Sequence, residues 1–140
     1  MNIAVLGSGN GGCAVAFDCA AHGHQVSLFD FEQFPASIKA VQNKGGIHCE
    51  GVLEGFQPVV SAGHDIEKAL DGADVIYAIG PAYSTRPFAE ACKPFLHKGQ
   101  TVIICPSSCG GCIEFKKSAG LDLRDEDIVV AETSTLPYAV

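Results

Sequence analysis

One stretch near the N-terminus constrains the fold of this chain more than any other. Residues 7–12 read Gly-Ser-Gly-Asn-Gly-Gly and match the spacing G-x-G-x-x-G. The continuous apolar run 2–6 precedes them, which is typical of a strand buried on both faces. A helical pattern follows over 11–22, with apolar residues at i, i+3, i+4 and i+7. The turn therefore joins a buried strand to a helix, and in that context the glycine spacing predicts dinucleotide binding.

Each glycine of this spacing has a physical role. Gly7 permits a tight turn, Gly9 lets the main chain approach a pyrophosphate, and Gly12 lets the helix pack against its strand. Free amides at the helix N-terminus, at the positive end of the helix dipole, are expected to hold the diphosphate. We expect Asn10 to cap the helix and Ser8 to donate a hydrogen bond to a phosphate. The predicted cofactor-binding residues of the turn are Gly7, Ser8, Gly9, Asn10, Gly11 and Gly12.

The second part of the pattern is an acidic residue that follows the next strand. Asp30 comes directly after a second strand expected at 25–29, where its carboxylate can accept hydrogen bonds from ribose hydroxyls. That carboxylate repels a 2′-phosphate, by about 1 kcal/mol per charge pair at 4 Å in water and roughly 4 near a protein surface. Residues 31–38 contain no Lys or Arg to offset that charge, and Glu32 adds another acid, so NAD(H) is favoured over NADP(H). The alternatives are FAD, which shares the spacing, and a purely structural turn with Asp30 as a solvated acid.

The rest of the chain alternates strand-like and helical windows. Further strands are expected at 74–79, 101–105 and 128–131, and further helices at 34–43, 64–70, 85–96 and 111–119. Between them, 45–60 has two short runs separated by glycines, which indicates a hairpin insertion. The pattern predicts the α/β class, with a doubly wound Rossmann-type parallel sheet and a small β-hairpin insertion. We expect residues 1–140 to form one dinucleotide-binding domain.

Composition excludes several classes of function. The formal net charge of -7 leaves no basic surface for nucleic acid. No run approaches the roughly 18 apolar residues that span a membrane, and the N-terminus does not resemble a secretory signal. Seven cysteines at irregular spacing are a poor disulfide framework, so reduced thiols and a cytoplasmic location are expected.

Two further turns are candidates for the rest of the cofactor site. In an open α/β sheet, ligands lie outside the carboxyl ends of the strands, near the switch point. Pro81, next to Gly80, follows the strand at 74–79, and Pro106 follows the strand at 101–105. We predict that Pro81 and Pro106 line the cofactor's ribose and nicotinamide. Ordinary strand-ending turns are the alternative.

The segment 105–112 carries three cysteines with C-x3-C-x2-C spacing. Such spacing can ligate an iron–sulfur cluster, but here it follows a dinucleotide-binding pattern, and too little chain comes after it for the usual cluster-binding barrel. A zinc site lacks a fourth local ligand. Cys109 and Cys112 also form a C-x-x-C at a helix start, where a redox-active thiolate is favoured. We prefer ordinary thiols in a glycine-rich turn, and predict no metal site.

Taken together, several motifs resemble a known family. They are the turn 7–12, the strand end 27–30, Pro106 with the glycines 110–111, and Ala-Glu-Thr-Ser-Thr-Leu-Pro-Tyr-Ala at 131–139. The chain resembles the N-terminal domain of octopine/nopaline-type opine dehydrogenases. Ketopantoate reductases and glycerol-3-phosphate dehydrogenases open with related domains.

This resemblance implies an oxidoreductase. Its reaction condenses an amino acid with a 2-oxo acid such as pyruvate to an imine, which NAD(P)H reduces. The family's catalytic histidine and its acidic partner lie in a helical second domain that would begin near Val140, so no catalytic residue is assigned here. We expect the 140-residue segment alone to be inactive, and to meet its small-molecule substrates through that absent domain. Apolar residues at 136–138 favour a homodimer.

A second hypothesis is a stand-alone NAD-binding module that acts as a sensor or interaction domain. The two hypotheses are separated by whether the coding sequence continues past Val140 into a helical segment of roughly 200 residues, because only the sensor acts without a catalytic partner.

Overall fold

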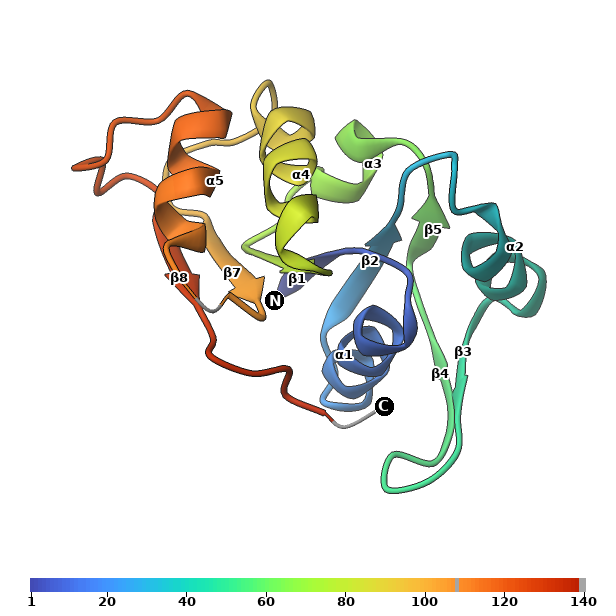
Figure 1. Ribbon diagram of the computed structural model, residues 1–140. Helices are drawn as coiled ribbons and strands as arrows, with labels where there is room; N and C mark the ends of the chain where they lie inside the picture. Colours follow the sequence, from blue (N-terminus) through green and yellow to red (C-terminus); the bar gives the residue numbers. More distant parts are fainter. Residues whose placement is uncertain (108, 139–140) are drawn as a thin grey trace.

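A computed structural model describes residues 1–107 and 109–138 (Figure 1). Within those residues the main sheet has six parallel strands in the order β5-β2-β1-β6-β7-β8. The strands are β1 (Asn2–Leu6), β2 (Gln25–Phe29), β5 (Ser61–Gly63), β6 (Val75–Ile79), β7 (Thr101–Cys105) and β8 (Val129–Glu132). The helices are α1 (Asn10–Ala21), α2 (Pro35–Lys44), α3 (Ile66–Leu70), α4 (Thr85–Cys92) and α5 (Gly111–Ala119), and a 3-10 turn, η1, spans Ala82–Ser84.

The strand order is that of a dinucleotide-binding fold. A separate antiparallel hairpin consists of β3 (Gly46–Cys49) and β4 (Gly55–Pro58). Without this hairpin, the order along the sheet reads 3-2-1-4-5-6, and the direction of winding reverses between β1 and β6. Ligands of such sheets bind beyond the carboxyl ends of the strands at this switch point. The predicted fold class and the predicted hairpin insertion are both confirmed.

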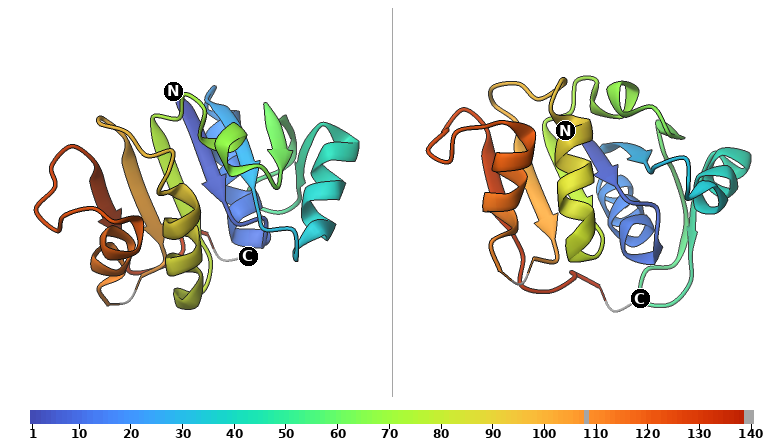
Figure 2. Two further views of the ribbon diagram at one scale, coloured as in Figure 1. Left: turned by 90° about the horizontal axis from the view of Figure 1, so that it is seen from above. Right: turned by 45° about the horizontal axis from the view of Figure 1, so that its top comes forward.

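Helices cover both faces of the sheet, as the views in Figure 2 show. Successive residues of β1 point to opposite faces, so Ile3 and Val5 pack with α1 and α2, whereas Ala4 and Leu6 pack with α3, α4 and α5. All four side chains are buried. A strand that is buried on both faces is apolar without interruption, which explains the continuous run that precedes the glycine-rich turn.

One strand was not predicted, and one helix is clearly shorter than predicted. Strand β5 was not predicted, because Ser-Ala-Gly has no apolar pattern; it pairs with β2, and the Ser61 hydroxyl donates to that of Ser27 at 3.0 Å. Helix α4 ends at Cys92 rather than at residue 96. Pro94 follows two residues later, and it has no amide hydrogen to donate the bond that would continue the helix.

Within residues 1–107 and 109–138, none of the helices has the length and apolar character that a membrane span requires.

Candidate functional site

The turn between β1 and α1 can be built only with glycine at two of its positions. Gly7 has φ +106°, and a Cβ there would lie 2.1 Å from the carbonyl oxygen of Ile79 on the neighbouring strand. A Cβ on Gly12 would lie 1.8 Å from the carbonyl oxygen of Gly7. Gly9 differs, because a Cβ there would meet nothing within 4 Å. Gly7 and Gly12 are therefore required by the fold, whereas Gly9 leaves open space beside the start of α1.

The N-terminus of α1 is free to receive an anion. Its N-cap is Gly9, whose carbonyl accepts the Cys13 amide at 2.9 Å. Asn10 is thus the first helical residue and not the predicted cap, because the helix starts one residue earlier. No side chain caps this end, and its first turn has no acidic residue. The first amides of a helix have no intrahelical partner and sit at the positive end of its dipole, so an anion binds there.

Helix α5 starts at the same edge of the sheet but is capped from within the protein. Glu132, which ends β8, accepts the Cys112 amide at 2.8 Å, and the Ser107 hydroxyl accepts the Gly111 amide at 3.0 Å. The hydrogen bond from the Cys112 amide lowers the pKa of the Glu132 carboxyl below its ordinary value, and further bonds, including one from Ser107, add to this effect. Of these two helix starts, the open one is that of α1, next to the open space at Gly9.

Asp30 lies beside this terminus and is held by three hydrogen bonds. The Ser8 amide and hydroxyl both donate to Oδ2 at 2.7 Å, and the Phe31 amide donates to Oδ1 at 2.8 Å. The sequence pattern predicts a phosphate as the partner of the Ser8 hydroxyl. In the structure this side chain is buried and donates to Asp30 instead, because the turn after β1 brings it against the end of β2.

The Asp30 carboxylate borders an open cavity of about 470 Å³ between the ends of β1, β2 and β6. Gly7, Gly9, Gly80 and Pro81 border it too. Its other lining residues are mainly apolar: Phe31, Gln33, Phe34, Ile79, Tyr83, Ser84, Pro87 and Phe88. Asp30 is the one charged residue in this described lining.

This cavity matches the requirements of the adenosine diphosphate half of a dinucleotide. Apolar and aromatic side chains suit an adenine ring, a carboxylate suits ribose hydroxyls, and open helix amides suit a diphosphate. Because Gly9 has no side chain and the space beside it is open, the main chain there can approach a diphosphate closely. The residues present therefore fit the cofactor that the sequence predicts.

The two predicted proline positions are at the carboxyl edge, on adjacent strands. Pro81 follows β6 and lines the cavity with Asp30. Pro106 follows β7, one strand further along the sheet, and the Ser107 amide after it donates to the Thr133 carbonyl at 2.7 Å. Pro106 therefore lies beyond the adenosine side of the switch point, where the remainder of a dinucleotide would extend.

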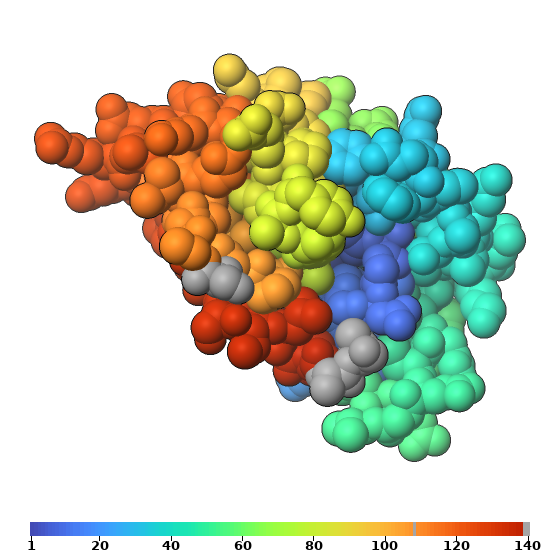
Figure 3. Space-filling model, viewed as in Figure 1, coloured from blue at the N-terminus to red at the C-terminus, as the bar shows by residue number. Residues whose placement is uncertain are grey.

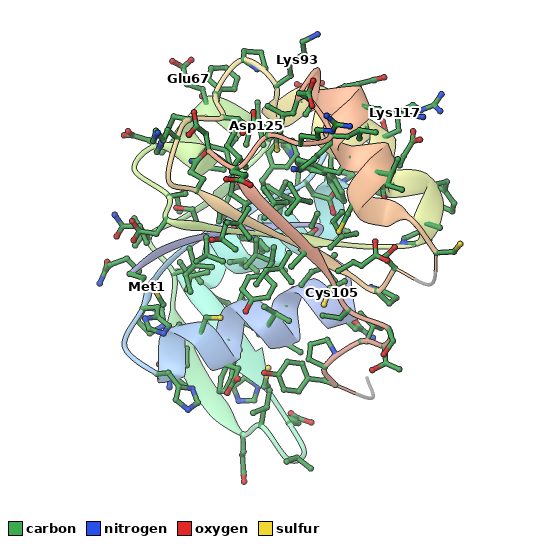
Figure 4. All side chains as sticks on the ribbon, turned by 90° about the vertical axis from the view of Figure 1, so that its left-hand side faces the viewer. Met1, Glu67, Lys93, Cys105, Lys117 and Asp125 are labelled. Atoms are coloured by element: carbon green, nitrogen blue, oxygen red, sulfur yellow. The ribbon has the colours of Figure 1, made fainter. Side chains whose placement is uncertain are left out.

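The segment after β8 returns along this edge to α1, and Figure 3 shows it against the N-terminal residues. The Cys105 thiol at the end of β7 lies 3.0 Å from the Thr133 hydroxyl, near the start of this segment (Figure 4). Leu136 lies beside Gly11, with a methyl 3.4 Å from where a Cβ would be. Tyr138 donates its hydroxyl to Asp18, a contact between residues 120 positions apart that sequence patterns do not reveal. Ala139, which ends the motif quoted above, lies outside the described residues.

The Cys112 thiol, at the start of α5, is not activated. Burial and a hydrogen bond with Glu132 raise the pKa of Cys112 to about 11. The thiolate that a helix start favours is therefore suppressed here, because the Glu132 carboxylate occupies that helix start. Ser108, within the motif, lies outside the described residues. Among those described, no three His, Cys, Asp or Glu side chains are grouped to hold a metal ion.

The fold and site define a Rossmann-type dinucleotide-binding domain of the kind that opens NAD-dependent dehydrogenases. The chain belongs to the family described as NAD-dependent glycerol-3-phosphate dehydrogenase N-terminus, which matches residues 2–110. This membership confirms NAD as the cofactor class that the sequence predicts.

Relatives extend this assignment. The chain is 34% identical over 139 residues to an opine dehydrogenase of Arthrobacter sp. (strain 1C), with 96% of this chain and 37% of that protein covered. It is 32% identical over 104 residues to a glycerol-3-phosphate dehydrogenase [NAD(P)+] of Mesorhizobium japonicum, with 74% of this chain and 29% of that protein covered. The resemblance to opine dehydrogenases is thus confirmed. The chain spans roughly a third of the length of these relatives.

Solved structures support the same fold. An octopine dehydrogenase in complex with NADH and agmatine has a TM-score of 0.83 at 22% identity, covering 99% of this chain and 36% of that one. A glycerol-3-phosphate dehydrogenase from Coxiella burnetii has a TM-score of 0.68 at 19% identity, covering 92% of this chain and 39% of that one.

Proposed function

We propose that residues 1–140 are the cofactor-binding domain of an NAD-dependent dehydrogenase and bind NADH across the switch point. The observation that carries this proposal is the open N-terminus of α1 next to the Asp30 carboxylate, both bordering one apolar cavity. The α1 amides bind the diphosphate, the Asp30 carboxylate accepts a hydrogen bond from the adenosine ribose, and the apolar wall excludes water from the adenine. When bound, NADH supplies the hydride for a reduction.

We further propose that the whole protein is an opine-type dehydrogenase, which joins an amino acid to a 2-oxo acid. What favours this over glycerol-3-phosphate oxidation is the extent of the similarity. The opine dehydrogenase similarity covers 96% of this chain, whereas the similarity to the Mesorhizobium glycerol-3-phosphate dehydrogenase covers 74%. One solved octopine dehydrogenase is described as a complex with NADH and pyruvate, and another as a complex with NADH and L-arginine. In this proposal the substrates bind mainly to a second domain, and residues 1–140 alone bind NADH without turnover.

The first test is a titration of residues 1–140 with NADH, followed by cofactor fluorescence and by calorimetry. We expect saturable binding that ADP-ribose competes away, because the proposed contacts are all to that half of the cofactor. Absence of saturable binding would overturn the proposed function.

The second test concerns the discrimination between NAD and NADP. Replacing Asp30 with serine removes the negative charge that borders the cavity, so we expect the affinity for NADPH to rise at least about tenfold relative to NADH. The measurement is the ratio of the two dissociation constants. Glu32→Ser is the matched control: Glu32 is an exposed acid two residues away that does not line the cavity. If both variants change the ratio equally, Asp30 is not the discriminating group.

The reaction is tested on the protein purified from its native cells through a tag at Met1. We expect NADH oxidation with pyruvate plus an amino-acid mixture, and none when glycerol 3-phosphate and NAD+ replace them. If the protein oxidises glycerol 3-phosphate and does not turn over pyruvate with amino acids, glycerol-3-phosphate dehydrogenase activity is favoured instead. NADH binding with no turnover of either pair would favour the stand-alone sensor.

A further inference from the structure

The hydrogen bonds between Ser8 and Asp30 do more than close a turn. We propose that Ser8 is a positioning residue for cofactor specificity: its hydroxyl fixes the Asp30 carboxylate in the orientation that admits NAD and rejects NADP. This inference rests on the proposed function and assigns the discrimination to a pair of residues instead of to Asp30 alone.

The geometry leaves the carboxylate little freedom. Two donors of Ser8 converge on Oδ2 at 2.7 Å each, and the Phe31 amide occupies Oδ1 at 2.8 Å. A carboxylate offers about four acceptor positions, so these three bonds fix its plane and leave about one position for a ligand. The main chain of Asp30 is held as well, because its amide donates to the Gly63 carbonyl at 3.2 Å and its carbonyl lies 2.7 Å from His64 Nδ1.

The surroundings offer no other way to accept a 2′-phosphate. The described lining of the cavity contains no Lys or Arg. Next to Asp30, the Phe31 ring stacks on Phe88 with centroids 5.4 Å apart and packs edge-on against Phe29. An aromatic cluster therefore stands beside the carboxylate. A 2′-phosphate can be admitted only if Asp30 turns away, and the Ser8 hydroxyl opposes that movement.

The test is the ratio of the dissociation constants for NADPH and NADH in Ser8→Ala. The variant keeps the amide bond to Asp30 and loses the hydroxyl bond. We expect the ratio to fall about tenfold, which is the low end of the value of a hydrogen bond to a charged group. Both constants contribute, because the ribose of NADH loses a pre-positioned acceptor while the 2′-phosphate of NADPH meets a carboxylate that can move.

Ser61→Ala is the matched control, since it also removes a partly buried hydroxyl that bonds to a side chain, Ser27, on β2. We expect its ratio to equal that of the parent protein. A Ser8→Ala ratio within about twofold of the parent would overturn the proposal, while its continued NADH binding would leave the proposed function intact. If Ser8→Ala does not fold, Ser8→Cys replaces the hydroxyl with a weak donor. A reduced ratio then supports the proposal, and an unchanged ratio overturns it.

Discussion

Replacing Gly9 with valine is expected to remove NADH binding from a protein that remains folded. Gly9 has φ -68° and ψ 178°, which any residue adopts, and a Cβ there meets no protein atom within 4 Å. The added side chain fills only the space beside the open start of α1. We expect the affinity for NADH to fall at least about a hundredfold, since contacts of two amides to phosphate are lost.

The measurement pairs a NADH titration with thermal unfolding of the same sample. The midpoint of unfolding is expected to stay close to that of the parent protein, and Gly9→Ala is expected to give an intermediate loss of affinity because its side chain is smaller. A Gly9→Val protein that binds NADH as the parent does would show that the diphosphate does not approach this turn.

The opposite result is expected at Gly12, where alanine should prevent stable folding. Its Cβ would lie 1.8 Å from the Gly7 carbonyl oxygen and 2.9 Å from the Gly7 carbonyl carbon. These are main-chain atoms, so relief requires α1 to move away from the turn. We expect the free energy of unfolding to fall by about 3 kcal/mol or more, the upper range for overpacking.

Urea denaturation of Gly12→Ala measures this loss, and Gly11→Ala next to it is the matched control. A Cβ on Gly11 lies 3.4 Å from a methyl of Leu136, an ordinary contact, and alanine favours helix over glycine by up to about 1 kcal/mol. We therefore expect Gly11→Ala to be as stable as the parent or more so. Equal stability of all three proteins would contradict the packing of α1 on the turn.

Local patterns in the sequence were enough to predict the core of the fold. The apolar run of β1, the glycine spacing and the place of Asp30 depend on neighbours in sequence, so a pattern can show them. For the same reason, the predicted bounds of most helices and strands lie close to the observed ones. The hairpin was also predictable, because glycines separate its two short strands.

The features that sequence did not reveal depend on contacts between distant residues. The Ser8 hydroxyl meets Asp30 across 22 positions, and Glu132 meets the Cys112 amide across 20. Whether a hydroxyl faces a phosphate or a carboxylate depends on how two turns meet, and a pattern of residue types does not contain that. Strand β5 was missed because its register with β2, not its composition, makes it a strand.

The carboxylate of Glu132 has a consequence for how a polyphosphate approaches this edge of the sheet. Helices α1 and α5 both follow strands that end at this edge, and the start of each attracts an anion unless it is already capped. Because the Glu132 carboxylate already neutralises the start of α5, that helix does not compete with α1 for a polyphosphate. Of these two helices, only α1 keeps a start that can hold the diphosphate.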